Sequence, residues 1–73
     1  MQFGNQYYEA LMEGRYQPRI DVHELEDGTF EASYADVNGN AIKFRDSSQN
    51  EAFRRCNDLV VEGIRNGEIH PFR

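Results

Sequence analysis

The sequence has a single cysteine, Cys56, among its 73 residues. One thiol cannot form an internal disulfide, and there is no second thiol with which to hold a metal ion. The two histidines, His23 and His70, are far apart in the sequence, and neither lies in the spacing of a metal-ligand motif. We therefore expect no metal site, and the free thiol is compatible with a reducing compartment.

Long apolar runs are also missing. No stretch approaches the roughly 20 residues that cross a bilayer. Met1 is followed by neither a basic segment nor an apolar signal region. We expect a cytoplasmic protein without membrane association. No catalytic motif is present, so we expect neither enzymatic activity nor a cofactor.

Positive charge is scarce, since eight Lys and Arg against 13 Asp and Glu give a net charge of −5. This balance repels nucleic acid phosphates and anionic membranes, so a basic protein is the favoured partner. Residues 20–42 contain no Lys or Arg at all. The acidic residues of the first hairpin that we assign to partner binding are Asp21, Glu24, Glu26, Asp27 and Glu31.

The short chain limits the architecture to one domain, residues 1–73. A domain this small buries only about 60% of the surface that its unfolded chain exposes. Regular elements that agree with one another must therefore stabilise it, and self-association is a further source of stability.

A helix is predicted at each end of the chain. Residues 5–13 begin with an Asn cap and stop at Gly14, with Tyr8, Leu11 and Met12 at helical spacing.

The second helix is marked by Ser48 and, three residues later, Glu51, which form a capping box. It ends at Asn66-Gly67. Its predicted apolar stripe consists of Ala52, Phe53, Cys56, Leu59, Val60, Gly63 and Ile64.

Two turns, Glu26-Asp27-Gly28 and Val37-Asn38-Gly39, divide the segment between the helices into three strands. A two-residue loop at Asn38-Gly39 would put Phe44 and Tyr34 on opposite faces. Three-residue loops with Gly in the left-handed conformation instead bring every large apolar residue except Leu25 and Val37 to one face. This agreement predicts an α+β fold, a three-stranded antiparallel meander packed on helices in the order α-β-β-β-α.

The same register predicts two polar rows on the other sheet face. Glu31 lies between His23 and Arg45 in one row. The second row consists of Asp21, Ser33 and Lys43. The rows could supply an acid–base pair and a nucleophile with helpers. We favour ordinary cross-strand pairing on a solvated face, because an open sheet face does not exclude water as catalysis requires.

The predicted order of elements, with Ala52 early in the last helix, is similar to the double-stranded RNA-binding domain. That family places lysines at the start of the last helix to contact phosphates. This sequence has Ser47, Ser48, Gln49, Asn50 and Glu51 there. The resemblance is therefore one of topology, and nucleic acid is not the expected partner.

Residues 16–64 resemble the small domain of HicB-like antitoxins. The residues that carry the resemblance are Asp27-Gly28, Ser33, Asp36-Val37-Asn38-Gly39, Asp46-Ser47 and Glu51-Ala52. In that family they mark the turns, the end of a strand and the start of the helix. The resemblance implies a β-β-β-α unit that binds a small basic toxin.

We interpret the chain as a small, acidic, non-enzymatic protein-interaction domain, antitoxin-like or regulatory, that binds a basic protein. A first alternative is a nucleic-acid-binding module that uses Lys43, Arg45, Arg54 and Arg55. A small enzyme that uses the His23 and Glu31 face is a second alternative. An accessory protein whose role the sequence does not express is a third.

Overall fold

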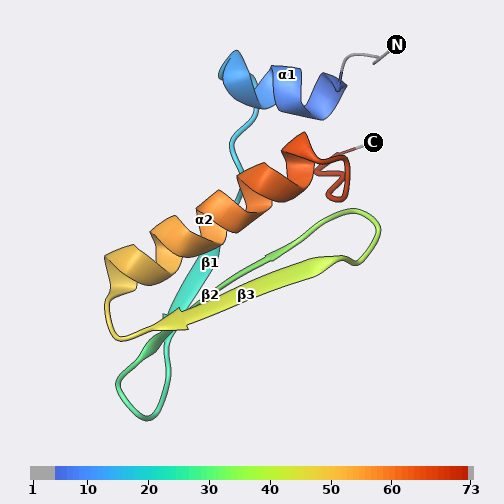
Figure 1. The fold of residues 1–73 in the computed structure, drawn as a ribbon. Coiled ribbons are helices and arrows are strands. Elements are labelled where there is room, and N and C mark those ends of the chain that lie inside the picture. Colours follow the sequence, from blue (N-terminus) through green and yellow to red (C-terminus); the bar gives the residue numbers. More distant parts are fainter. Residues whose placement is uncertain (1–4, 73) are drawn as a thin grey trace.

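The computed structural model describes residues 5–72. Its elements are α1 (Gln6–Met12), β1 (Asp21–Glu24), β2 (Phe30–Ala35), β3 (Ala41–Asp46) and α2 (Gln49–Arg65). The strands form an antiparallel sheet in the order β1-β2-β3, and α2 lies across one face of it (Figure 1). The predicted α+β fold and its order of elements are confirmed.

Both hairpins have the predicted three-residue loops. Each loop ends in a glycine with positive φ, 86° at Gly28 and 86° at Gly39. The first loop is closed by a hydrogen bond from the Leu25 N–H to the Thr29 carbonyl at 2.7 Å. The resulting register pairs Val22 with Ala32, Tyr34 with Ile42, and Ala32 with Phe44, so the large apolar residues share one face as predicted.

The core lies between the middle strand and α2. Ala32 on β2 is fully buried, and its small side chain lets the helix approach the sheet closely. The other buried apolar residues around it are Tyr34, Ala52, Cys56, Val60, Ile64 and Ile69. Cys56 is therefore a small core residue, as its place on the apolar face of the helix predicts.

The apolar stripe of α2 is narrower than the sequence predicts. Phe53 is 45% exposed and Leu59 is 47% exposed, whereas the other five predicted residues are buried. Three strands form a sheet too narrow to cover so wide an arc of the helix surface, so the residues at the two sides of the stripe reach solvent. Within residues 5–72, no helix has both the length and the apolar character needed to cross a bilayer.

The predicted capping box is only half formed. The Ser48 hydroxyl accepts the Glu51 N–H at 3.3 Å, as expected for an N-cap. The Ser48 N–H, however, donates to the Asp46 carboxylate at 2.8 Å. The Glu51 carboxylate binds Arg54 instead, with a 2.7 Å ion pair. A guanidinium one turn along the helix is the stronger partner for that carboxylate.

Helix α1 is capped by Asn5, whose side chain accepts the N–H groups of Tyr7 and Tyr8. The Asn5 amide also donates to the Ile64 carbonyl at 2.7 Å, and this bond ties α1 to the end of α2. Met12, which stands at helical spacing with Tyr8 and Leu11, has a side chain that is 59% exposed. Ala10 is the buried residue of this helix.

The segment after α2 folds back onto the molecule. Ile69 is only 4% exposed and belongs to the core. Its neighbour His70 is bound through its backbone to the β2–β3 loop. Phe72 contacts the rings of Tyr7 and Tyr16 at centroid distances of 4.9 and 5.6 Å. The C-terminal segment thus joins α1, the sheet and α2.

Candidate functional site

The helix-free face of the sheet carries the first predicted polar row. One Glu31 oxygen lies 3.7 Å from His23 Nε2, and the other lies 3.5 Å from Arg45 Nη2. The Glu31 side chain is 19% exposed, whereas those of His23 and Arg45 are 57% and 61% exposed. At such distances in solvent, these pairs contribute a few tenths of a kcal/mol each. The row is assembled as predicted, and its geometry fits cross-strand stabilisation.

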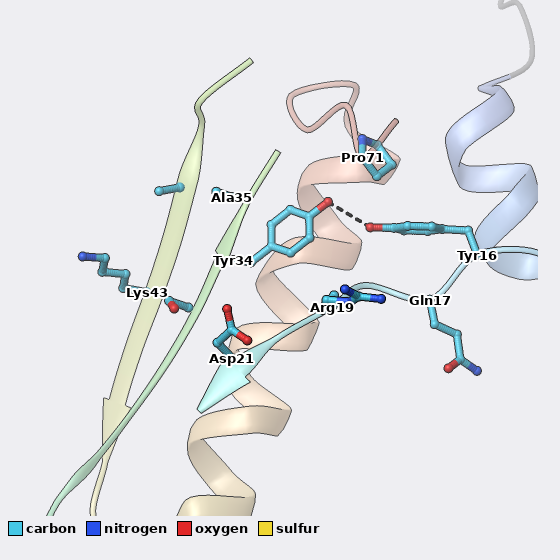
Figure 2. Close-up of a pocket in the computed structure, with 10 residues that line it drawn as sticks. Tyr16, Gln17, Arg19, Asp21, Tyr34, Ala35, Lys43 and Pro71 are labelled. Carbon is cyan, nitrogen blue, oxygen red and sulfur yellow. Dashed lines mark hydrogen bonds between the residues drawn. The ribbon is translucent and has the colours of Figure 1, made fainter. Parts of the chain in front are cut away.

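The second predicted row, Asp21, Ser33 and Lys43, is also in register. It lines an open depression of about 670 Å³ (Figure 2). Within residues 5–72, no side-chain hydrogen bond joins these three residues to one another. Activation of a serine requires a base in hydrogen-bond contact with its hydroxyl. The row therefore has the residue types of a nucleophilic site without its contacts.

A pair of tyrosines lies at one side of the depression. The hydroxyls of Tyr16 and Tyr34 are 2.9 Å apart, and Pro71 lies beside them (Figure 2). Burial and the hydrogen bond with Tyr16 raise the pKa of Tyr34. Tyr34 therefore stays neutral, and the hydrogen bond satisfies two polar groups at the boundary of the core.

The five acidic residues predicted to bind a partner do not form one surface. Asp21 and Glu31 lie on the helix-free face. Glu24 lies on the opposite face of the sheet, and Glu26 and Asp27 lie in the turn. A hairpin distributes consecutive residues over both faces of the sheet, so closeness along the chain does not produce a single patch.

Two of these five carboxylates have structural partners. Asp27 accepts the N–H and the hydroxyl of Thr29 at 3.0 and 2.6 Å, and these bonds lower its pKa. Glu31 is bound between His23 and Arg45. Among the described residues, Asp21, Glu24 and Glu26 form no ion pair, and all three are exposed. They are the acidic groups available to a partner.

The basic residues named for the nucleic-acid alternative are largely paired. Arg54 binds Glu51 at 2.7 Å and Asp58 at 3.3 Å. Arg55 lies 3.8 Å from Glu51 and 5.8 Å from the centroid of the Phe44 ring. The hydrogen bond from Arg54 lowers the pKa of Glu51, so the carboxylate remains charged beside these cations.

The thiol and imidazole groups lie apart from one another. Cys56 is fully buried under the sheet, and burial raises the pKa of its thiol. His23 lies on the helix-free face, and His70 stacks on Tyr7 at a centroid distance of 5.3 Å. Within residues 5–72, no group of three or more His, Cys, Asp or Glu side chains could hold a metal ion.

Sequence reasoning missed an apolar groove between α2 and β3. It has a volume of about 350 Å³ and is lined by Ile42, Leu59, Gly63 and Ile69, with polar residues at its rim. The signal that could have found it is Ile69, an apolar residue placed soon after the helix-ending Gly67. Docking of that residue creates one wall of the groove.

No protein-family model matches this sequence, and the comparisons with curated proteins and with solved structures found no similar protein.

Proposed function

We propose that this protein is a small, non-enzymatic interaction domain that binds a positively charged protein, with the β1–β2 turn as the first point of contact. The observation that carries the proposal is the placement of Glu24 and Glu26. Both are exposed at one end of the sheet, and neither has a cationic partner among the described residues. A surface of this kind attracts a basic protein from a distance and speeds its association.

The turn that carries these carboxylates is held in place. Gly28 adopts the positive φ that the loop requires, and its N–H donates to the Leu25 carbonyl at 3.0 Å. The two bonds from Thr29 to Asp27 brace the same loop. Asp27 and Glu31 thus support the hairpin, whereas Glu24 and Glu26 present charge. A preformed turn loses little conformational entropy on binding.

Two observations favour this function over its alternatives. The polar rows lie on an open, solvated face, which does not exclude water as a catalytic site does. Arg45, Arg54 and Arg55 are engaged with carboxylates, so the field that would attract phosphates is weakened. The antitoxin-like form of the proposal, binding of a small basic toxin, agrees with the β-β-β-α order and the net charge of −5.

The test compares two double charge reversals, Glu24→Lys with Glu26→Lys, and Glu9→Lys with Glu13→Lys. The second pair lies on α1 and at its C-cap, at the opposite end of the molecule from the β1–β2 turn, and changes the net charge equally (Figure 1). Partners are captured from a lysate of the source cells with the parent, identified by mass spectrometry and purified. Association rates are then measured at low and high ionic strength.

We expect the hairpin variant to associate more slowly and with a weaker salt dependence, because rim charges act mainly on the association rate. The α1 variant should behave like the parent. Equal rates for the parent and the hairpin variant at low ionic strength would exclude the β1–β2 turn as the contact. A gel shift with duplex RNA or DNA that weakens with added salt would favour the nucleic-acid alternative.

A further inference from the structure

Strand β3 has one unpaired edge. It pairs with β2 on one side, and within residues 5–72 no strand lies on its other side. The Asp36 N–H donates to the Asn40 carbonyl at 2.9 Å, and hydrogen-bonded pairs alternate from there along an antiparallel ladder. The backbone groups of Ala41, Lys43 and Arg45 therefore point away from β2. They are free to pair with another strand.

The apolar groove runs beside this edge, on the side of α2. Leu59 is 47% exposed in it, and Ile42 on β3 forms its other wall. Glu62 and Glu68, which are both exposed, also line it. An extended segment added to β3 would turn every second side chain toward this groove, where apolar groups are favoured and acidic groups are repelled.

The remaining side chains of such a segment would lie on the helix-free face. There they would neighbour Lys43 and Arg45, which point to that face from β3. Arg45 already contacts Glu31 at 3.5 Å, whereas Lys43 forms no ion pair among the described residues. Opposite charges on neighbouring strands stabilise pairing, so acidic residues fit these positions.

We propose that β3 and the groove accept an extended segment of a partner protein in which apolar and acidic residues alternate. The segment would extend the sheet by one strand, with apolar residues toward α2 and acidic residues toward Lys43 and Arg45. The negative charges of Glu62 and Glu68 beside the groove oppose a shift of one residue, because the shift would turn the acidic side chains of the segment toward them. This inference goes beyond the proposed function, since it concerns the opposite edge of the sheet and a different partner chemistry.

A second copy of the same strand is disfavoured at this edge in the two registers that pair most of β3. When two copies of β3 pair antiparallel, residues whose side chains lie on the same face stand opposite one another. Lys43 would face Lys43 of the other copy in one register, and Lys43 would face Arg45 in the next. Like charges directly opposite one another destabilise a strand pair.

The probe is a blocked eight-residue peptide in which Val and Glu alternate, and its control has Lys in place of each Glu. Each is titrated into the isotope-labelled protein, and backbone amide shifts are followed by NMR. We expect the Glu peptide to shift the amides of Lys43, Arg45 and Leu59, and the Lys peptide to bind at least about fivefold more weakly. Binding of both peptides with equal affinity, or shifts confined to β1, would overturn the proposal.

Two variants sharpen the test. Lys43→Glu should lower the affinity for the Glu peptide about fivefold and raise the affinity for the Lys peptide about fivefold. Arg19→Glu, an equal charge change near the other edge, should change neither affinity by more than about twofold. An unchanged preference in Lys43→Glu would refute the assignment of the acidic positions. The double variant Glu24→Lys with Glu26→Lys should bind the Glu peptide as the parent does, so this test and that of the proposed function can fail separately.

Ala41→Pro removes an edge N–H without changing charge, at the first position of the strand, where proline is tolerated. This variant should bind the Glu peptide more weakly, while the amide chemical shifts of the rest of the sheet stay as in the parent. If Ala41→Pro does not fold, the affinities of Lys43→Glu for the two peptides still test the proposal. Concentration-dependent shifts at Lys43 and Arg45 without peptide would show that a second copy occupies the edge, and would overturn the proposal.

Discussion

The carboxylate of Asp36 accepts the backbone N–H of His70 at 2.9 Å and thereby joins the β2–β3 loop to the C-terminal segment. The same carboxylate accepts the N–H groups of Asn38 and Asn40 at 2.9 and 2.8 Å. In return, the Val37 N–H donates to the His70 carbonyl at 3.2 Å. One aspartate thus organises the second hairpin and holds the end of the chain.

This arrangement predicts a pH dependence of stability. Partial desolvation opposes ionisation of Asp36, but the hydrogen bonds from His70, Asn40 and Asn38 outweigh it and lower its pKa from 3.8 to about 2. A carboxylate whose pKa is lower in the folded state stabilises the fold above its unfolded pKa. That contribution is lost as the pH falls through the folded pKa.

We expect Asp36→Ala to be less stable than the parent at neutral pH, and the difference to shrink between about pH 4 and pH 2. Denaturant unfolding of both proteins across this range measures it. A difference that stays constant down to about pH 2 would show that Asp36 acts through its shape or packing and not through its charge.

The loop glycines predict a second effect. At Gly28 and Gly39 an added Cβ would meet no atom within 4 Å, so the cost of a side chain comes from the backbone alone. Because both residues have φ of 86°, Gly28→Ala and Gly39→Ala should each destabilise the fold by about 1 kcal/mol or more. Denaturant midpoints equal to that of the parent would contradict the left-handed assignment.

The sheet could be predicted because two independent turns constrain the same pattern. Only three-residue loops place Tyr34, Ile42 and Phe44 on one face, and a shift of one residue would separate them. The polar row of His23, Glu31 and Arg45 follows from that register. Local chemistry and face alternation therefore determine this part of the structure.

The C-terminal segment could not be predicted in the same way. Ile69 and Phe72 follow the last helix with no periodicity, and their positions are determined by contacts with α1 and α2. The exposure of Phe53 and Leu59 likewise depends on the width of the sheet and not on the helix pattern. For the acidic hairpin, counting charges along the chain did not take into account that Glu24 and Glu31 lie on opposite faces of the sheet.

Cys56 supplies a third prediction. It is fully buried, and its S–H lies 3.8 Å from the Ile42 carbonyl. Cys56→Asp would bury a charge under the sheet and should cost at least about 3 kcal/mol. Arg55→Asp, on the exposed side of the same helix turn, should cost about 1 kcal/mol, for the lost contacts with Phe44 and Glu51.

The measurement for this pair is denaturant unfolding, supported by thiol labelling of the native parent. Labelling should be far slower than in the unfolded chain, because the thiol is shielded and its pKa is raised. Labelling at the rate of the unfolded chain would mean that the apolar face of α2 is assigned incorrectly.

Gly63 and Ile69 allow the docking of the C-terminal segment to be measured directly. In a helix, Gly→Ala ordinarily stabilises by about 1 kcal/mol. A Cβ at position 63, however, would collide with Cγ1 of Ile69, an atom close to its own backbone that cannot easily move aside. Such overpacking costs about 1–3 kcal/mol, so Gly63→Ala should be destabilising in the parent.

In an Ile69→Ala background the collision is absent, and the same substitution should become stabilising. Unfolding free energies of the four proteins form a double-mutant cycle, and we expect a coupling of at least about 1 kcal/mol. If Gly63→Ala has the same effect in both backgrounds, Ile69 does not pack against α2 in solution. The wall that it provides to the groove beside β3 would then be missing.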